Sequence, residues 1–210
     1  GGSFLTSPAA STPARGGVSQ AIFGTLMMAL FVAGFAFPIG IMAAIYLEEY
    51  ADPERWYNRL IEVNIQNLAA VPSVVYGILG LGLVVRGPLS LGPVLLAGMI
   101  ILALLVLPVV IISSREAIRA VPDSIRDGSL ALGATRWQTI WRTTLPNSVP
   151  GIATGSILAL SRAIGEAAPL VIIGVALTVT FNPASVYDRF TTLPMQIYSY
   201  AQRPQEDFII

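Results

Sequence analysis

Long apolar segments alternate with short polar ones along this chain of 210 residues. The apolar segments cover residues 21–47, 63–85, 89–112 and 147–177. A helix needs about 20 apolar residues to cross the hydrocarbon core of a bilayer, so each segment is long enough to span it. The apolar runs are continuous, whereas the strands of a membrane barrel alternate over about ten residues. The pattern therefore predicts an all-α polytopic membrane protein with four full spans.

The segments between these runs read as loops. Residues 1–20 are rich in Gly, Ser, Pro and Thr and predict an extracytoplasmic loop. Residues 48–62 predict a short polar loop, in which Glu48 and Glu49 are expected to be solvated. Residues 178–207 are polar and predict a segment outside the membrane. The chain starts without Met and stops in another apolar stretch, so we expect it to be a fragment.

Composition supports the membrane assignment and excludes several functions. The chain is 54% hydrophobic and 11% charged, with a mean hydropathy of +0.71. A soluble domain has about 25% charged residues. A net charge of zero gives no support for nucleic-acid binding. The chain lacks His, Cys and Lys, which excludes the usual zinc sites, thiol nucleophiles and P-loop lysines. We therefore expect neither a cofactor nor an enzymatic activity of its own.

The distribution of arginine predicts the orientation in the membrane. With four spans, the 48–62 and 115–142 loops lie on one side, and the 1–20, 86–88 and 178–207 segments lie on the other. The first side carries Arg55, Arg59, Arg115, Arg119, Arg126, Arg136 and Arg142. The second side carries Arg15, Arg86, Arg189 and Arg203. The positive-inside rule then places the 115–142 loop in the cytoplasm.

This charged loop predicts two short helices. Pro122 suits the start of the first helix, with Asp123 or Ser124 as its cap. Gly133 is expected to end it, because glycine readily adopts the left-handed conformation found there.

The second helix is expected to start at Thr135, with Gln138 completing a capping box. Pro146 is expected to end the loop. Four residues are predicted to share one helix face: Trp137, Ile140, Trp141 and Thr144. Such a hairpin fits either a structure anchored at the membrane surface by its tryptophans or a docking site for a partner protein.

The spacing in this loop resembles the EAA motif of ABC importer permeases, E-A-A-x3-G-x9-I-x-L-P. The matching positions are Asp127-Gly128-Ser129, Gly133, Thr143 in place of Ile, and Leu145-Pro146. Four further strings are similar to permeases of phosphate importers of the PstA type: VPSVVYG at 71–77, LPVVIISSRE at 107–116, SRAIGE at 161–166 and TLPMQIY at 192–198.

The resemblance implies a type I ABC importer transmembrane domain over residues 21–210, truncated to four full spans of the six found in this family. It places a cytoplasmic coupling loop at 115–146. The residues implied to contact the ATPase subunit are Asp127, Gly128, Ser129, Ala131, Leu132, Gly133 and Ala134. The implied partners are an ATPase dimer, a second related permease subunit, an extracytoplasmic phosphate-binding protein and the lipid of a bacterial plasma membrane.

Arg162 and Glu166 are the charges within the fourth apolar segment. A charge at the bilayer centre costs roughly 2.5–3.5 kcal/mol on insertion scales, so such residues face protein or water. Their i,i+4 spacing allows them to pair on one helix face. The pair is either a structural contact or part of the translocation pathway, in which Arg162 meets an anion through its planar guanidinium.

Several functions remain open at this stage. The resemblance implies a permease for inorganic phosphate, and Arg162 is equally compatible with another anion or small solute. An ATP-independent secondary transporter is compatible with proline-broken helices and an intramembrane ion pair. A membrane-embedded enzyme using Asp chemistry is the least supported alternative.

Overall fold

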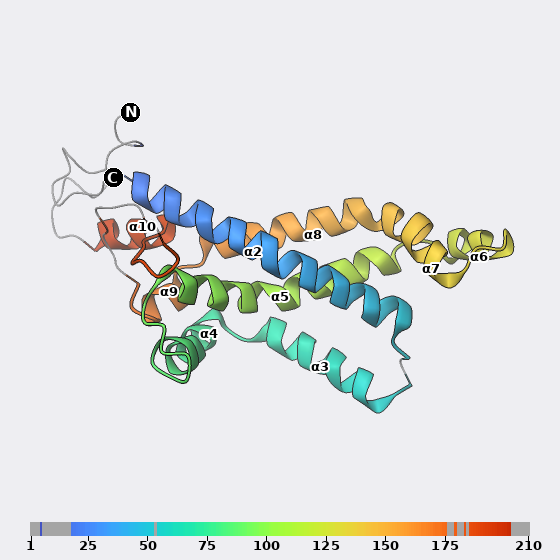
Figure 1. Ribbon diagram of the computed structural model, residues 1–210, viewed down its shortest axis with the longest axis horizontal. Helices are drawn as coiled ribbons and strands as arrows, with labels where there is room; N and C mark the ends of the chain where they lie inside the picture. The colour runs from blue at the N-terminus through green and yellow to red at the C-terminus, as the bar shows by residue number, and fades with distance from the viewer. Residues whose placement is uncertain are drawn as a thin grey trace. The chain divides into compact units, whose positions relative to one another are not determined.

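The computed structural model describes Leu5, 18–52, 54–175, Val179, Pro183 and 185–202 (Figure 1). Every regular element in this part of the chain is helical, which confirms the expected all-α fold. The expected loop at 1–20 lies almost entirely outside the described residues. The apolar stretch that starts at Phe208 also lies outside them.

The helical elements of the described residues range from 4 to 27 residues in length. They are α2 (Ser19–Ile45), η2 (Tyr46–Tyr50), α3 (Trp56–Ala70), α4 (Ser73–Gly80), η3 (Leu81–Val85), α5 (Leu95–Arg119), α6 (Asp123–Ala131), α7 (Arg136–Thr139), η4 (Ile140–Thr144), α8 (Leu145–Gly165), α9 (Ala168–Ile172) and α10 (Leu193–Ala201). The η segments are π-helical turns, in which an N–H bonds to the carbonyl five residues back.

Three helical stretches are long and apolar enough to cross a membrane, namely Ser19–Tyr50, Leu95–Arg119 and Arg136–Ile172, the last of which includes the break between α8 and α9. The pair Trp56–Ala70 and Ser73–Val85 makes a fourth if it is counted as one broken span. The chain is thus a multi-pass membrane protein. Its helices differ in extent from the predicted segments: α3 begins before residue 63, and α5 begins at Leu95 and continues to Arg119.

The break between α3 and α4 lies at Val71-Pro72. A residue before proline is disfavoured in the helical conformation, so α3 ends at Ala70. Pro72 has an extended backbone (φ −57°, ψ 140°) and precedes the first turn of α4. The segment predicted at 63–85 is therefore two helices.

Pro146 lies in the first turn of α8, beside the boundary predicted between the loop and the fourth apolar segment. The π turn η4 joins α7 to α8, and the Leu145 N–H bonds to the Ile140 carbonyl five residues back. Proline lacks an N–H and normally interrupts a helix interior, but it is tolerated in a first turn. Pro146 is the second residue of α8, directly after this wide turn. The second short helix of the loop thus continues into the fourth apolar segment without a break.

The described chain divides into two compact units. Unit 1 comprises residues 1–32, 71–104 and 162–210, and unit 2 comprises 33–70 and 105–161. Within unit 1, α4 lies beside α9 (Figure 1). Gly77 of α4 packs against Pro169 of α9, where an added Cβ would lie 2.8 Å from the Pro169 Cα. Glycine permits this close approach of two helices.

Unit 2 contains a small core where α2, α5, α7–η4 and α8 meet. Its buried members are Ala44, Ile45, Ile118, Ile140 and Ile152. Three partly buried side chains pack against it, namely Ile41, Ala117 and Leu145. This core lies beneath the base of the coupling loop, because Ile118 precedes α6 and Ile140 follows α7.

Candidate functional site: the coupling loop and an intramembrane ion pair

The turn after α6 is a Schellman motif centred on Gly133. Gly133 has φ +86°, the left-handed conformation that glycine adopts without steric cost. Its N–H bonds to the Leu130 carbonyl at 2.9 Å, and the Ala134 N–H bonds to the Ser129 carbonyl at 3.2 Å. These are the two hydrogen bonds that define the motif. The prediction that Gly133 ends the first helix is confirmed.

The start of α7 is the predicted capping box. The Gln138 N–H donates to the Thr135 hydroxyl at 3.3 Å, and the Thr135 N–H donates to the Gln138 side-chain oxygen at 2.9 Å. The prediction for α6 is wrong, because its cap is Pro122, and neither Asp123 nor Ser124 caps it. Pro122 fixes an extended backbone (φ −58°, ψ 139°) directly before the helix, and Asp123 becomes its first residue.

Most of the residues expected to contact an ATPase subunit are exposed. Those that are exposed are Asp127, Gly128, Ala131, Leu132 and Gly133, and those that are partly buried are Ser129 and Ala134. Leu132, at the end of α6, is 91% exposed. A Cβ added at Gly128 or Gly133 would meet nothing within 4 Å. This side of α6 is therefore open to a partner.

Ser129 has a different environment from its neighbours. Its hydroxyl lies 3.0 Å from the hydroxyl of Thr139, and the Thr143 hydroxyl donates to it at 3.5 Å. The side chain thus joins α6 to α7 and η4 and is directed away from the open face.

The four residues predicted to share one face of the second helix occupy two faces. Ile140 and Thr144 are buried, whereas Trp137 and Trp141 are exposed. The two indole rings pack against each other with centroids 5.2 Å apart. Ile140 faces the core of unit 2, and the tryptophans face outwards.

Glu48 is partly buried and Glu49 is buried, both in ion pairs, so the expectation that they are solvated is wrong. Their side chains are 13% and 9% exposed. The Arg119 Nε donates to a Glu48 carboxylate oxygen at 2.9 Å, and the Arg126 Nη2 lies 3.3 Å from Glu49 Oε1. Both acids lie in η2, a helical extension of α2 where the sequence predicted a loop. The one available signal was an adjacent acidic pair directly after an apolar run.

Arg162 and Glu166 come together as their spacing predicted. The Arg162 Nε lies 3.7 Å from Glu166 Oε1, and the Arg162 side chain remains 45% exposed. The helix ends at Gly165, so Glu166 lies just beyond it, and α9 begins at Ala168. The predicted fourth segment is thus interrupted at the ion pair, and residues 176–178 lie outside the described part.

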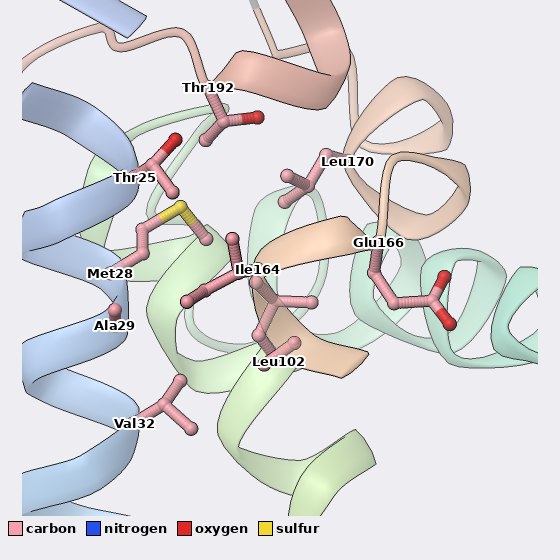
Figure 2. A pocket seen from close by; sticks show the side chains of 10 residues that line it. Thr25, Met28, Ala29, Val32, Leu102, Ile164, Glu166, Leu170 and Thr192 are labelled. Carbon is pink, nitrogen blue, oxygen red and sulfur yellow. The ribbon is translucent and has the colours of Figure 1, made fainter. Parts of the chain in front are cut away.

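A small cavity in unit 1 lies beside this pair (Figure 2). Its volume is about 10 Å³, and it is lined by Thr25, Met28, Ala29, Val32, Leu102, Ala163, Ile164, Glu166, Leu170 and Thr192. A water molecule needs about 10–15 Å³ of such space. Figure 2 shows the Glu166 carboxylate directed away from Thr25 and Met28. The cavity is too small for a phosphate ion.

Metal ligation has no support among the described residues. They contain no group of three His, Cys, Asp or Glu side chains placed to hold a metal ion.

Comparison with known proteins places this chain in a family. Residues 36–198 match the family described as "Binding-protein-dependent transport system inner membrane component". The chain is 35% identical over 190 residues to "Phosphate transport system permease protein PstA 1" of Mycobacterium tuberculosis (strain CDC 1551 / Oshkosh), covering 90% of this chain and 61% of that protein.

Two further relatives agree. The chain is 36% identical to "Phosphate transport system permease protein PstA" of Yersinia pestis, covering 91% of this chain and 63% of that protein. It is 37% identical to "Probable ABC transporter permease protein YqgH" of Bacillus subtilis (strain 168), covering 90% of this chain and 64% of that protein. The chain thus spans about three fifths of the length of these curated relatives. The resemblance found in the sequence is confirmed, and the chain belongs to the family of binding-protein-dependent transport system inner membrane components.

Proposed function

We propose that this chain is part of the permease subunit of an ATP-driven importer in a bacterial plasma membrane. It forms part of the pathway for inorganic phosphate and couples transport to a separate ATPase subunit. The observation that carries this proposal is the exposed face of α6, a helix that is hydrogen-bonded to α7. The names of the relatives from Mycobacterium tuberculosis and Yersinia pestis support phosphate as the substrate.

The two short helices of the coupling loop, α6 and α7, are expected to move together. The open face of α6 carries Asp127, Gly128, Ala131 and Leu132, and glycine there permits close approach of a partner surface. The Schellman turn and the capping box fix the connection between α6 and α7, because each satisfies the backbone groups at a helix end by hydrogen bonds. A partner that displaces α6 therefore displaces α7.

The helix that begins with α7 continues through η4 and α8 to Gly165. Displacement at its first turn is passed along one helical segment without a loop, and Arg162 lies in the last turn of that segment. ATP hydrolysis in the partner would thus act on the helix that carries the proposed anion contact. We expect that partner to be an ATPase dimer, and the binding protein and a second permease subunit to complete the complex.

Arg162 suits a phosphate ion in transit. A guanidinium makes paired hydrogen bonds to phosphate oxygens. One ion pair at 3.7 Å leaves the side chain 45% exposed, so the guanidinium is not enclosed by Glu166. The nearby carboxylate offsets part of its charge, which favours release after binding. The alternative is a purely structural pair, and transport by an Arg162 variant separates the two.

The test is ATPase activity of the full complex in liposomes with phosphate-loaded binding protein. We expect phosphate to stimulate hydrolysis and to accumulate inside, whereas sulfate does neither. Gly133→Glu should insert normally and hydrolyse ATP without import, because the strained turn misplaces α6. Stimulation by sulfate alone would indicate another anion, and import without the ATPase subunit would indicate a secondary transporter. Undiminished import by Gly133→Glu would contradict the coupling role.

A further inference from the structure

Glu49 lies at the junction between the end of α2 and the coupling loop. It is the fourth residue of η2, the π turn that extends α2 beyond Ile45. This turn is closed by the Ala51 N–H, which bonds to the Tyr46 carbonyl at 2.9 Å. Glu48 and Glu49 are adjacent in sequence and have different partners, because successive residues of a helix point in different directions.

Glu48 joins α2 to α5. Two nitrogens of Arg119, Nε and Nη2, donate to its carboxylate oxygens at 2.9 and 3.0 Å. Arg115 donates to the same carboxylate at 3.3 Å and to Glu62 of α3 at 3.0 Å. These contacts fix η2 on the end of α5.

Glu49 joins α2 to the coupling loop instead. Its carboxylate pairs with Arg126 of α6, and its backbone carbonyl accepts a hydrogen bond from Arg136, the first residue of α7. The guanidinium of Arg136 also lies over the ring of Tyr50, 5.8 Å from its centroid. One residue of η2 therefore holds an arginine on each side of the Gly133 turn.

Arg126 is fixed by more than this ion pair. Its Nη2 also donates to the Ile118 carbonyl in the last turns of α5 at 2.7 Å. Arg126 thus ties α6 to both α5 and η2. Glu49, Arg126 and Arg136 also line an open groove of about 720 Å³. Its other lining residues are Asp123, Asp127, Leu130, Thr139 and Ile140.

A nearly buried carboxylate is a weak source of stability. Removing two charges from water costs about as much as their attraction returns, so replacement of such a pair by apolar groups is often neutral. In some proteins buried polar groups are retained because they fix the relative position of two elements. The Glu49 contacts are therefore better explained by the position they impose on α6 than by the energy they contribute.

We infer that Glu49 is a positioning residue that transmits displacement of the coupling loop to α2. The chain itself connects the loop only to α5 and α8, and Glu49 adds α2 as a third helix that moves with α6. This inference rests on the proposed function, in which a partner ATPase drives the loop. Without Glu49, α6 still binds its partner and ATP is still hydrolysed, but less of the movement reaches α2.

The first test is the number of phosphate ions imported per ATP hydrolysed by the reconstituted complex. We expect Glu49→Gln to lower this ratio about threefold or more while the ATPase rate stays within twofold of wild type. Glu49→Asp keeps the charge and should restore much of the ratio. Arg126→Gln should lower the ratio at least as much, because it removes the same ion pair and also the hydrogen bond to the Ile118 carbonyl. The double variant should be no worse than Arg126→Gln alone, since the ion pair is already lost there. The matched control is Glu54→Gln, an exposed acid in the following segment.

The second test does not depend on activity. The chain has no cysteine, so Tyr46→Cys in η2 and Ser124→Cys in α6, both exposed, introduce two defined labelling sites into it. The complex without these two cysteines measures background labelling of the other subunits. In the assembled complex we expect one narrow distance distribution, which Glu49→Gln broadens and Glu54→Gln leaves unchanged.

An unchanged ratio in Glu49→Gln, in a complex whose wild type imports phosphate, would overturn the inference. Import and ATP hydrolysis that fall together, with an unchanged number of phosphate ions per ATP, would also overturn it. That result would indicate a loss of stability alone. Failure of the wild type to import phosphate would count against the proposed function instead, and the distance measurement would then decide the role of Glu49 by itself.

Discussion

The hydroxyl of Ser129 in α6 lies 3.0 Å from the hydroxyl of Thr139 in α7, and this contact holds the two helices of the coupling loop together. Ser129→Ala removes it and leaves the open face of α6 unaltered. A neutral hydrogen bond contributes about 1 kcal/mol, so amide exchange in α6 should accelerate roughly fivefold. Hydrogen exchange of the assembled complex measures this effect.

Ser124→Ala is the control for this substitution, because Ser124 is exposed in the first turn of the same helix. Equal acceleration in the two variants would show that the Ser129 contact has no special effect.

Gly133→Ala should destabilise the turn between α6 and α7. Its φ of +86° is unfavourable for any residue with a Cβ, at a cost of about 1–2 kcal/mol. Gly133→Asn should cost less, because asparagine tolerates this conformation. Gly128→Ala should instead raise the stability of α6, because Gly128 is inside this helix and an added Cβ meets nothing within 4 Å. Thermal unfolding in detergent gives all three values, and the order Gly128→Ala, Gly133→Asn, Gly133→Ala is the expected ranking.

Gly77→Ala should disturb the contact between α4 and α9. The added Cβ would lie 2.8 Å from the Cα of Pro169, a backbone atom that cannot rotate away. Overpacking of this kind costs about 1–3 kcal/mol. Gly82→Ala is the matched control in the following π turn, because its Cβ meets nothing within 4 Å. A melting temperature equally lowered in both variants would contradict the close packing of Gly77.

Arg115→Met should destabilise unit 2 more than most single changes. The Arg115 side chain is 12% exposed and pairs with Glu48 and Glu62, so its loss leaves two carboxylates without their shared cation. Removing one partner of a buried pair costs about 3–5 kcal/mol, and the partial exposure of Glu62 favours the lower end. About 3 kcal/mol corresponds to a melting temperature lower by roughly 6–12 °C. Arg59→Met, at an exposed position of α3, should change it little.

Arg162→Gln should abolish most phosphate import while the complex still assembles. Charge-assisted hydrogen bonds contribute about 1.5–3 kcal/mol, so the initial rate of uptake should fall at least tenfold. Glu166→Gln removes the carboxylate 3.7 Å away and should retain more uptake than Arg162→Gln. If the two variants were equally impaired and the double variant no worse, the pair would be structural.

Local sequence alone determined the features that depend on neighbouring residues. The left-handed turn at Gly133 and the capping box of Thr135 and Gln138 were predicted correctly, because each is completed within about five residues. The i,i+4 pairing of Arg162 with Glu166 was predicted for the same reason. The apolar runs predicted the helical membrane fold, since their length is set by the thickness of the bilayer.

Tertiary structure decided the features whose partners are distant in sequence. Glu48 and Arg119 are 71 residues apart, and Glu49 and Arg136 are 87 apart, so nothing near the two acids distinguishes a buried pair from a solvated one. Ile140 is buried and Trp137 is exposed because Ile140 packs into the core formed with Ile45, Ile118 and Ile152. This difference likewise depends on residues distant in sequence. The sequence thus predicted the two-helix loop and its turn, and only the packing of four helices showed that Glu49 at the end of α2 contacts Arg126 and Arg136 of that loop.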